Sequence, residues 1–292
     1  MSDRPPLLHP LTAELVVIAP GRLGRPGARG RTERVAPAAV CPLCEGHEGL
    51  TPPEVAAVAP PGRPPDGPGW SVRTVPNKYP AVPGHEVVVH GPAHVLSVAD
   101  VPDPVMVGSV GMWLERARVH SGAGAASVLV AVNEGAAAGA SLEHSHSQIV
   151  PFARITPGAA ARRAAFSAGC PLCPPPAGHV VRHADGLLTV CPPWSRVPYE
   201  LLIVPEQHRP WPDDSAAVAA ALADAARRLR AALGTDLSWN AILHLPPAGD
   251  RAEHHWHLEL LPRLTVPASL ELGAGVWVNI VDPAAAAAEL AT

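Results

Sequence analysis

The chain carries one ordered set of cysteines and histidines twice. The first copy is a Cys-Pro-Leu-Cys segment, a lone histidine and a His-x-His pair, at residues 41–44, at His94 and at residues 144–146. The second copy repeats this order at residues 170–173, at His208 and at residues 255–257. An ordered repeat of this kind predicts a duplicated structural unit, in which each half folds around its own ligands.

Two thiolates and two imidazoles in each copy form the ligand set of a tetrahedral zinc site. The first predicted site uses Cys41, Cys44, His94 and His144, and the second uses Cys170, Cys173, His208 and His255. His254 and His257 compete for the last position, and His255 is preferred because it aligns with His144. Four protein ligands leave no open position for water, so both zinc ions are predicted to be structural. The alternative is buried thiols with unrelated surface histidines.

The composition predicts a well-filled core, because 47% of the 292 residues are apolar and only 16% are charged. A net charge of −4 does not indicate a nucleic-acid partner, which favours a basic surface. The first ten residues contain no apolar signal segment, and no apolar run of about 18 residues predicts a membrane span. Cysteine pairs with metal-type spacing favour a reducing compartment, so we expect a cytoplasmic protein.

The hydrophobic pattern predicts an α+β fold with antiparallel strands and one main crossing helix in each half. We expect domains over residues 1–155 and 156–292. Strands are predicted over residues 15–19, 72–76, 86–90, 127–133, 148–150, 187–191, 199–204, 239–245 and 255–261. Helices are predicted over residues 104–120 and 214–233, and residues 27–69 are expected to form a loop. The chain is expected to end with a strand within residues 271–282 and a helix over residues 283–290.

The segment His144-Ser-His146-Ser-Gln148 is the predicted reactive stretch. On a strand these three side chains share one face, because side chains alternate with a period of two. If a metal holds His144, then His146 lies on the same face with a free ring, and a neutral imidazole is a competent nucleophile toward phosphorus. The preceding stretch contains Gly135, Gly139 and Ser141, which suits backbone amides closing on a phosphate. The alternative for His146 is a half-buried structural role.

The two copies differ two residues after the His-x-His pair, where the first has Gln148 and the second has Glu259. A carboxylate repels a phosphate dianion, whereas an amide N–H attracts it. Only the first copy is therefore predicted to be catalytic.

A family resemblance rests on several motifs in the same order along nearly the whole chain. They are Pro20-x-Arg22-x-x-Arg25-Pro26, the first Cys-Pro-Leu-Cys segment, Pro76-Asn77-Lys-Tyr-Pro80, Gly91-Pro-Ala-His94, Asn133-x-Gly135 and Gly139-Ala-Ser141-x-x-His144-x-His146-x-Gln148. This set resembles galactose-1-phosphate uridylyltransferase and its relatives in the histidine-triad superfamily, which include ADP-glucose phosphorylase-like enzymes. The chain differs by having Ser145 where proline is frequent and Ser147 where glycine is frequent. The second cysteine pair resembles the two-zinc branch near ADP-glucose phosphorylase.

The resemblance implies two histidine-triad-like domains, a cytosolic homodimer and ping-pong nucleotidyl transfer. By position, His146 is the implied nucleophile, while Gln148 and Ser141 contact the phosphoryl oxygens. The implied substrate-binding residues are Arg22, Arg25, Asn77, Asn133 and Gly139. The first set of metal ligands matches the family zinc site.

The sequence leaves several functions open. The first expectation is transfer of a nucleoside monophosphate between a nucleotide sugar and a sugar 1-phosphate, from UDP-glucose to galactose 1-phosphate. The alternative enzyme is a phosphorylase that uses phosphate as acceptor on ADP-glucose or a dinucleoside polyphosphate. A hydrolase is expected to have a third histidine where Gln148 stands, since glutamine cannot supply an acid or a base. A zinc-stabilised nucleotide-binding protein is the non-enzymatic alternative.

Overall fold

The computed structural model describes residues 6–20, 40–176, 179–249 and 253–292. The elements of the first half are β1 (Leu7–Leu8), β2 (Leu15–Ile18), β3 (Ala56–Val58), β4 (Val72–Pro76), β5 (Glu86–Val89), α1 (Asp103–Gly122), β6 (Ser127–Glu134) and β7 (His146–Phe152). Those of the second half are α2 (Pro157–Ser167), β8 (Val180–Ala184), β9 (Leu187–Val190), β10 (Leu201–Pro205), α3 (Ser215–Leu233), β11 (Trp239–His244), β12 (His257–Pro262), α4 (Ser269–Ala274), β13 (Val276–Asn279) and α5 (Pro283–Leu290).

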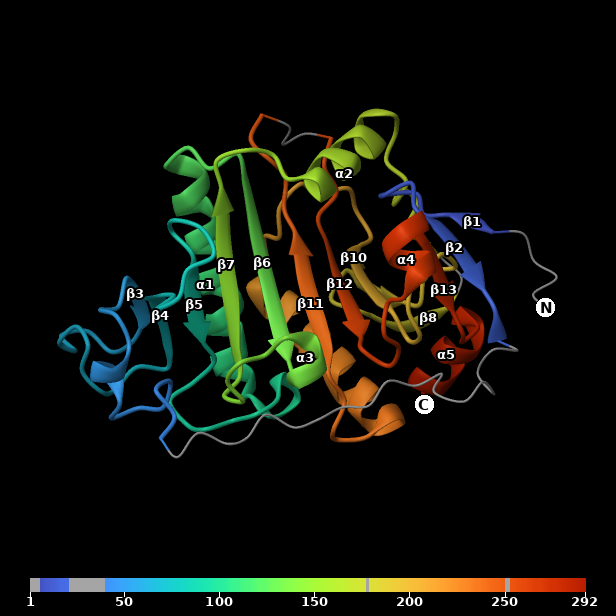
Figure 1. Ribbon diagram of the computed structural model, residues 1–292. Coiled ribbons are helices and arrows are strands. Elements are labelled where there is room, and N and C mark those ends of the chain that lie inside the picture. The colour runs from blue at the N-terminus through green and yellow to red at the C-terminus, as the bar shows by residue number, and fades with distance from the viewer. Residues whose placement is uncertain (1–5, 21–39, 177–178, 250–252) are drawn as a thin grey trace.

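Ten of the described strands form one antiparallel sheet that runs through both halves, in the order β3-β4-β5-β7-β6-β11-β12-β10-β9-β8 (Figure 1). The halves meet where β6 pairs with β11, and Ala131 lies opposite Ile242. On either side of this pair, Gln148 lies opposite Ala131 and Glu259 lies opposite Ile242. The sheet therefore has an approximate two-fold axis, and it places Gln148 and Glu259 in one transverse row. Three strand spacings, about 14 Å, separate them.

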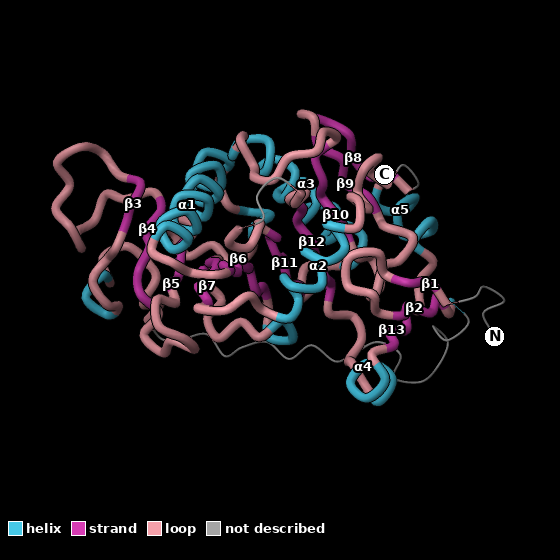
Figure 2. Tube along the Cα trace, turned by 90° about the horizontal axis from the view of Figure 1, so that it is seen from above, coloured by secondary structure: helices cyan, strands magenta, loops and turns pink. Residues whose placement is uncertain are grey.

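The two long helices cover one face of this sheet, and α2 lies on the opposite face (Figure 2). Helix α1 packs on β4 to β7, α3 packs on β9 and β10, and the two helices also pack against each other. A single apolar cluster lies beneath them, and it includes Trp113 from α1, Leu222 from α3 and Trp239 from β11. The α+β fold with antiparallel strands and one main helix per half is thus confirmed, and the two halves share one core.

A small sheet of β1, β2 and β13 lies beside the second half, with α5 next to it (Figure 1). There β2 pairs with β1 on one side and with β13 in parallel on the other. Among the described residues, no helix has the length and apolar character needed to cross a membrane.

Some predicted elements differ from the structure. Residues 271–282 contain the end of α4 and only a four-residue strand, β13, because Gly275 adopts a left-handed conformation that ends the helix. Residues 27–39 of the expected loop over residues 27–69 lie outside the described residues, and the remainder contains β3, which pairs with β4. The sequence analysis did not identify α2, β1 or β8. α2 is an 11-residue helix that begins after Thr156, whose side chain accepts a hydrogen bond from the backbone N–H of Ala159, and it has Pro157 at its first position. These start signals were present in the sequence but were not used.

Candidate active site and metal clusters

The four predicted ligands of the first half form one cluster. Sγ of Cys41 lies 3.6 Å from Nδ1 of His144, and Sγ of Cys44 lies 3.4 Å from Nδ1 of His94. In a tetrahedral zinc site, sulfur and nitrogen ligands lie about 3.6 Å apart. Nε2 of His144 donates to the carbonyl oxygen of Gly91 at 3.0 Å, which leaves Nδ1 as the electron-pair donor. The four side chains could therefore hold a metal ion.

The second cluster repeats this geometry. Sγ of Cys173 lies 3.4 Å from Nδ1 of His208 and 3.3 Å from Nδ1 of His255, while Sγ of Cys170 lies 3.4 Å from Nδ1 of His255. Nε2 of His255 donates to the Pro205 carbonyl oxygen at 3.2 Å. This cluster could also hold a metal ion, and His255 is the member of its triplet that lies there.

His146 begins β7 directly beside the first metal cluster, and it is 6% exposed. Its Nδ1 donates to the carbonyl oxygen of His144 at 2.7 Å. This bond fixes the tautomer, so Nε2 carries a lone pair. Nε2 forms no hydrogen bond with the described residues, and it is not fully buried. Burial lowers the pKa of His146, although the bond to His144 opposes this effect. A neutral ring with a free Nε2 is the form that attacks phosphorus.

Gln148 lies two residues after His146 on the same face of β7, where it is partly exposed. Its Oε1 atom lies 2.9 Å from Nε2 of His85, the residue before β5. Asn77, which follows β4, lies in the same group, because its Nδ2 is 3.3 Å from Nε2 of His85. The structure thus brings together two predicted amides, Asn77 and Gln148, around a histidine that the sequence analysis did not identify.

The third predicted amide, Asn133, lies near the end of β6 opposite Asn240 of β11. Nδ2 of Asn240 donates to Oδ1 of Asn133 at 2.8 Å and to the carbonyl oxygen of Ala138 at 2.9 Å. Asn240 belongs to the second half, so the site uses residues from both copies. No motif identified Asn240, because only the pairing of β6 with β11 brings it to the site.

The glycine-rich stretch after β6 forms a short 3-10 turn at Ala136–Ala138. Gly135 precedes it with φ 81°, and a Cβ atom there would lie 2.2 Å from Oγ of Ser238. Gly139 ends the turn in a left-handed conformation, and Ser141 follows as an exposed residue. The turn therefore requires glycine at both positions.

Of the predicted substrate contacts, Arg22 and Arg25 lie outside the described residues.

Ser145 and Ser147, at which the sequence departs from the pattern of the family it resembles, lie on the other face of the same segment. Oγ of Ser145 lies 3.0 Å from Nδ1 of His90, and Oγ of Ser147 lies 3.0 Å from Nε2 of His90. The indole Nε1 of Trp113 also donates to Ser147, at 2.5 Å. Buried hydroxyl groups need such partners. Ser145 and Ser147 thus anchor β7 to the core, while His146 and Gln148 face the site.

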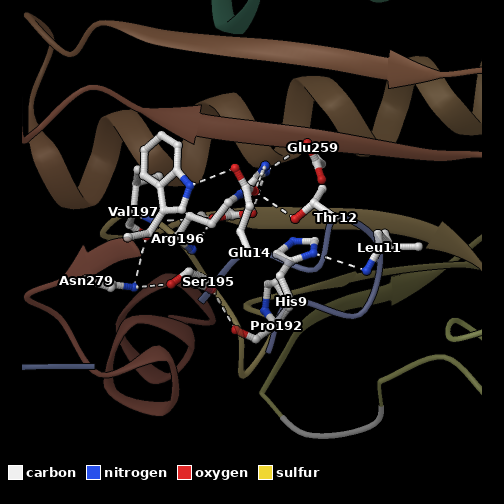
Figure 3. Close-up of polar contacts among 12 residues, drawn as sticks. His9, Leu11, Thr12, Glu14, Pro192, Ser195, Arg196, Val197, Glu259 and Asn279 are labelled. Atoms are coloured by element: carbon white, nitrogen blue, oxygen red, sulfur yellow. Dashed lines mark hydrogen bonds and ion pairs between the residues drawn. The ribbon is translucent and has the colours of Figure 1, made fainter. Parts of the chain in front are cut away.

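The corresponding position in the second half is a buried ionic network. Oε2 of Glu259 lies 2.9 Å from Nη2 of Arg196 and 3.3 Å from Nη2 of Arg162. His244 donates to the same oxygen from Nε2, at 3.0 Å. Figure 3 shows Arg196 between Glu14 and Glu259, with the ring of His9 beside them. Although burial opposes it, Arg196 and its neighbours hold the pKa of Glu259 well below its usual range.

His257 has the same tautomer as His146, because its Nδ1 donates to the His255 carbonyl oxygen at 2.9 Å. Its Nε2, however, is buried and has no hydrogen-bond partner among the described residues. The rings of Phe166 from α2 and of His244 lie 6.1 and 4.6 Å from the His257 ring, centroid to centroid. Burial lowers the pKa of His257 far below its usual value. The second copy therefore keeps the imidazole geometry but encloses it.

Comparison with known proteins supports the family resemblance. The chain is 27% identical to ADP-glucose phosphorylase from Arabidopsis thaliana, over 94% of this chain and 88% of that protein. The crystal structure of an ADP-glucose phosphorylase from Arabidopsis thaliana with bound ADP-glucose superposes with a TM-score of 0.85 at 24% identity, covering 99% of this chain and 98% of the other. A uridylyltransferase structure superposes with a TM-score of 0.74 at 25% identity, over 98% and 97%. No family model matches the chain. The predicted resemblance to the uridylyltransferases and their relatives is thereby confirmed.

Proposed function

We propose that this chain is a nucleotide-sugar phosphorylase, which passes a nucleoside monophosphate from ADP-glucose to inorganic phosphate through His146. The observation that carries the proposal is the geometry of His146, whose tautomer is fixed by its Nδ1 hydrogen bond and whose ring lies on the same face of β7 as the Gln148 side chain. The class of reaction predicted from the sequence, nucleotidyl transfer, is confirmed, because the named relatives are a phosphorylase and uridylyltransferases.

The reaction divides into two displacements. In the first, Nε2 of His146 attacks the α-phosphorus, and the sugar 1-phosphate leaves with the electrons of the broken P–O bond. In the second, a phosphate oxygen attacks the same phosphorus, the P–N bond breaks, and a nucleoside diphosphate leaves. The hydrogen on Nδ1 of His146 stays on that nitrogen in both steps, where it is donated to the carbonyl oxygen of His144. Because the sugar phosphate is a good leaving group, the first step needs little help from an acid.

Gln148 favours transfer over hydrolysis in this scheme. An amide can hold the phosphoryl oxygens by hydrogen bonds, but it cannot remove a proton from water. Among the described residues, the side chain that forms a hydrogen bond with Gln148 is His85, and this bond is to the amide oxygen. The nucleotidyl-histidine would therefore persist until phosphate arrives.

The phosphorylase reaction replaces the first expectation from the sequence, transfer from UDP-glucose to galactose 1-phosphate. The ADP-glucose phosphorylase structure is more similar in fold to this chain than the uridylyltransferase structure is, with TM-scores of 0.85 and 0.74. Uridylyl transfer is the second candidate, because the same covalent intermediate can pass its nucleotide to a sugar 1-phosphate. A nucleotide-binding protein without activity does not account for the free Nε2 of His146.

The two Cys2His2 clusters are proposed to bind zinc, since two thiolates and two imidazoles at tetrahedral spacing are typical of structural zinc. Bound zinc would hold His144 in place, and with it the carbonyl oxygen that orients His146. The homodimer and the cytoplasmic location remain predictions from the resemblance and the composition.

The test is to incubate the protein with ADP-glucose and UDP-glucose, each labelled at the α-phosphorus. Trapping of label in an acid-labile, base-stable linkage identifies a nucleotidyl-histidine. The labelled protein is then given phosphate or a sugar 1-phosphate. Labelling by ADP-glucose, with ADP released by phosphate, is the expected result. Labelling by UDP-glucose alone, with discharge only by sugar 1-phosphate, would support the second candidate.

A further inference from the structure

We infer that His85 and Asn240 are positioning residues, which turn the amides of Gln148 and Asn133 so that their nitrogens face the substrate phosphates. The inference rests on the proposed function. An amide can rotate by 180° with almost no change in shape, so its hydrogen-bond partners decide which end is presented. A nitrogen attracts an anionic oxygen, and the amide oxygen repels it.

The direction in which the Gln148 amide faces follows from the backbone N–H of Ala81, which acts through His85. The N–H of Ala81 donates to Nδ1 of His85 at 3.2 Å, so Nδ1 is an acceptor. A neutral imidazole then carries its hydrogen on Nε2, which donates to Oε1 of Gln148 at 2.9 Å. In this tautomer the contact with Nδ2 of Asn77, at 3.3 Å, joins two donors and is not a hydrogen bond. The oxygen of Gln148 is therefore held inside the protein, and its nitrogen faces away from His85.

The orientation of Asn133 follows from a second backbone group. The carbonyl oxygen of Ala138 can only accept, so the group of Asn240 that contacts it at 2.9 Å is the nitrogen. The other hydrogen of this nitrogen is directed at Asn133, at 2.8 Å, and must meet an oxygen. The Asn133 nitrogen is thus left without a partner among the described residues.

The Asn77 amide is oriented directly by a backbone group, with no second side chain between them. The backbone N–H of Tyr79 donates to its Oδ1 at 2.9 Å, which again leaves the amide nitrogen for a ligand. All three predicted amides thus have an engaged oxygen and an available nitrogen. A site that accepts phosphates gains a set of preorganised donors, which need no reorientation when charge develops on the phosphoryl oxygens.

The second half lacks this arrangement at equivalent positions. The strand registers place Glu200 where the first half has His85, since Leu202 and Val87 lie opposite Glu259 and Gln148. Glu200 accepts hydrogen bonds from the backbone N–H and the guanidinium of Arg196. Carboxylates have replaced both members of the histidine–glutamine pair, so no amide donor is presented there.

The first test measures the single-turnover rate of labelling of His146. His85→Met removes the N–H donor but keeps a side chain of similar size, and it is expected to lower this rate about 10- to 100-fold. This loss is smaller than the loss expected when a preorganised donor to the phosphate is itself deleted. His85→Gln keeps an N–H near the position of Nε2 and should stay within about threefold of wild type. His183→Met changes an exposed histidine and is the matched control. Equal loss in His85→Met and His85→Gln would overturn the inference.

A double-mutant cycle separates positioning from a general structural effect. If His85 acts through Gln148, adding His85→Met to Gln148→Ala should change the labelling rate by less than about twofold. Asn240→Leu should likewise have little effect on top of Asn133→Ala. A second loss as large as the first, in folded double variants, would contradict the positioning role.

Nitrogen-15 NMR of the histidine rings tests the arrangement without any reaction. His85 is expected as the Nε2–H tautomer, and His146 as the Nδ1–H tautomer. An Nδ1–H tautomer for His85 would overturn the inference even if the protein is labelled normally. Failure of the wild-type protein to take up any nucleotide would refute the proposed function instead, and the tautomer measurement would still decide the role of His85.

Discussion

The first-half site and its second-half counterpart have the same histidine geometry in opposite surroundings. In both, Nδ1 donates to a carbonyl oxygen two residues earlier, beside a Cys2His2 cluster. Beside His146 stands a neutral amide, and beside His257 stands the carboxylate of a buried ionic network. The backbone repeat therefore determines which nitrogen is free, whereas the neighbouring side chains determine whether that nitrogen can meet a phosphate.

The second copy contributes to stability instead. Glu259 is 2% exposed, and Arg162, Arg196 and His244 all contact it. Buried charges require such partners, because an isolated ion in a protein interior is strongly destabilising. The second half also supplies Asn240, which donates a hydrogen bond to Asn133, so the candidate site contains residues from both copies.

Separate substitutions of His146 and His257 give the largest expected difference in covalent labelling. His146→Gly should lower covalent labelling by about 10⁴-fold or more, because it removes the nucleophile. His257→Asn is the matched control and should leave labelling of folded protein within about threefold of wild type. Circular dichroism establishes folding of both variants. Loss of labelling in a folded His257→Asn variant, with retention in His146→Gly, would reverse the assignment of the two halves.

Glu259→Gln tests the stabilising role of the second copy. The substitution leaves Arg162 and Arg196 with one fewer carboxylate in a buried site, and the free energy of unfolding should fall by about 3–5 kcal/mol. Chemical denaturation measures this change at pH 7. A loss below about 1 kcal/mol would show that the network contributes no more than a surface ion pair.

Gln148→Glu reproduces the second-half residue in the first site. A carboxylate there repels the phosphoryl oxygens and no longer supplies an N–H, so labelling should fall by about 10²- to 10³-fold. Stability should change far less than in Glu259→Gln, since Gln148 is partly exposed. Gln148→Met is the control for loss of the amide without added charge, and it should be more active than Gln148→Glu.

Cysteine substitutions compare the two metal clusters. Cys41→Ser and Cys170→Ser should each remove one of two bound zinc ions, measured by metal analysis. Cys41→Ser should also lower labelling about tenfold, because His144 then no longer holds the carbonyl oxygen that orients His146. Cys170→Ser should lower labelling by less than twofold in protein that is still folded. Equal effects on labelling would mean that zinc acts only through global stability.

His244 of the second half should contribute to acid sensitivity, as should the buried His90 of the first half, whose pKa burial lowers to about 3. Burial, reinforced by Arg162, lowers the pKa of His244 to about 4, whereas the equivalent first-half residue is Asn133, which does not titrate. An unfolded histidine has a pKa near 6.5, so this contribution to stability is complete above pH 6.5 and is lost as pH falls toward 4. His244→Gln should reduce the slope of unfolding free energy against pH by up to about 1.4 kcal/mol per unit in this range. An unchanged slope from pH 6.5 to 5 would contradict the assignment.

Local sequence signals predicted most strands and both long helices. β4 and α5 occur over the predicted residues, and α3 begins after Asp214, whose side chain accepts hydrogen bonds from two backbone N–H groups. These elements have clear apolar patterns or a recognisable cap. The helix α2 also has a cap, Thr156, followed by Pro157, so its sequence signal was overlooked. In contrast, β3 and β8 are edge strands whose formation depends on their single neighbours. Local propensity carries little information about such elements.

The sequence alone determined the duplicated plan, the two sets of candidate metal ligands and the contrast between Gln148 and Glu259, because each depends on residue type and order. Only the tertiary structure decided how these parts act together. Pairing of β6 with β11 brings Asn240 to Asn133 across 107 residues of chain. The turn before β5 places His85 against Gln148, and α2 brings Phe166 over His257. Such contacts join residues far apart along the chain, and their hydrogen bonds exist only after the shared core has fixed the strand registers.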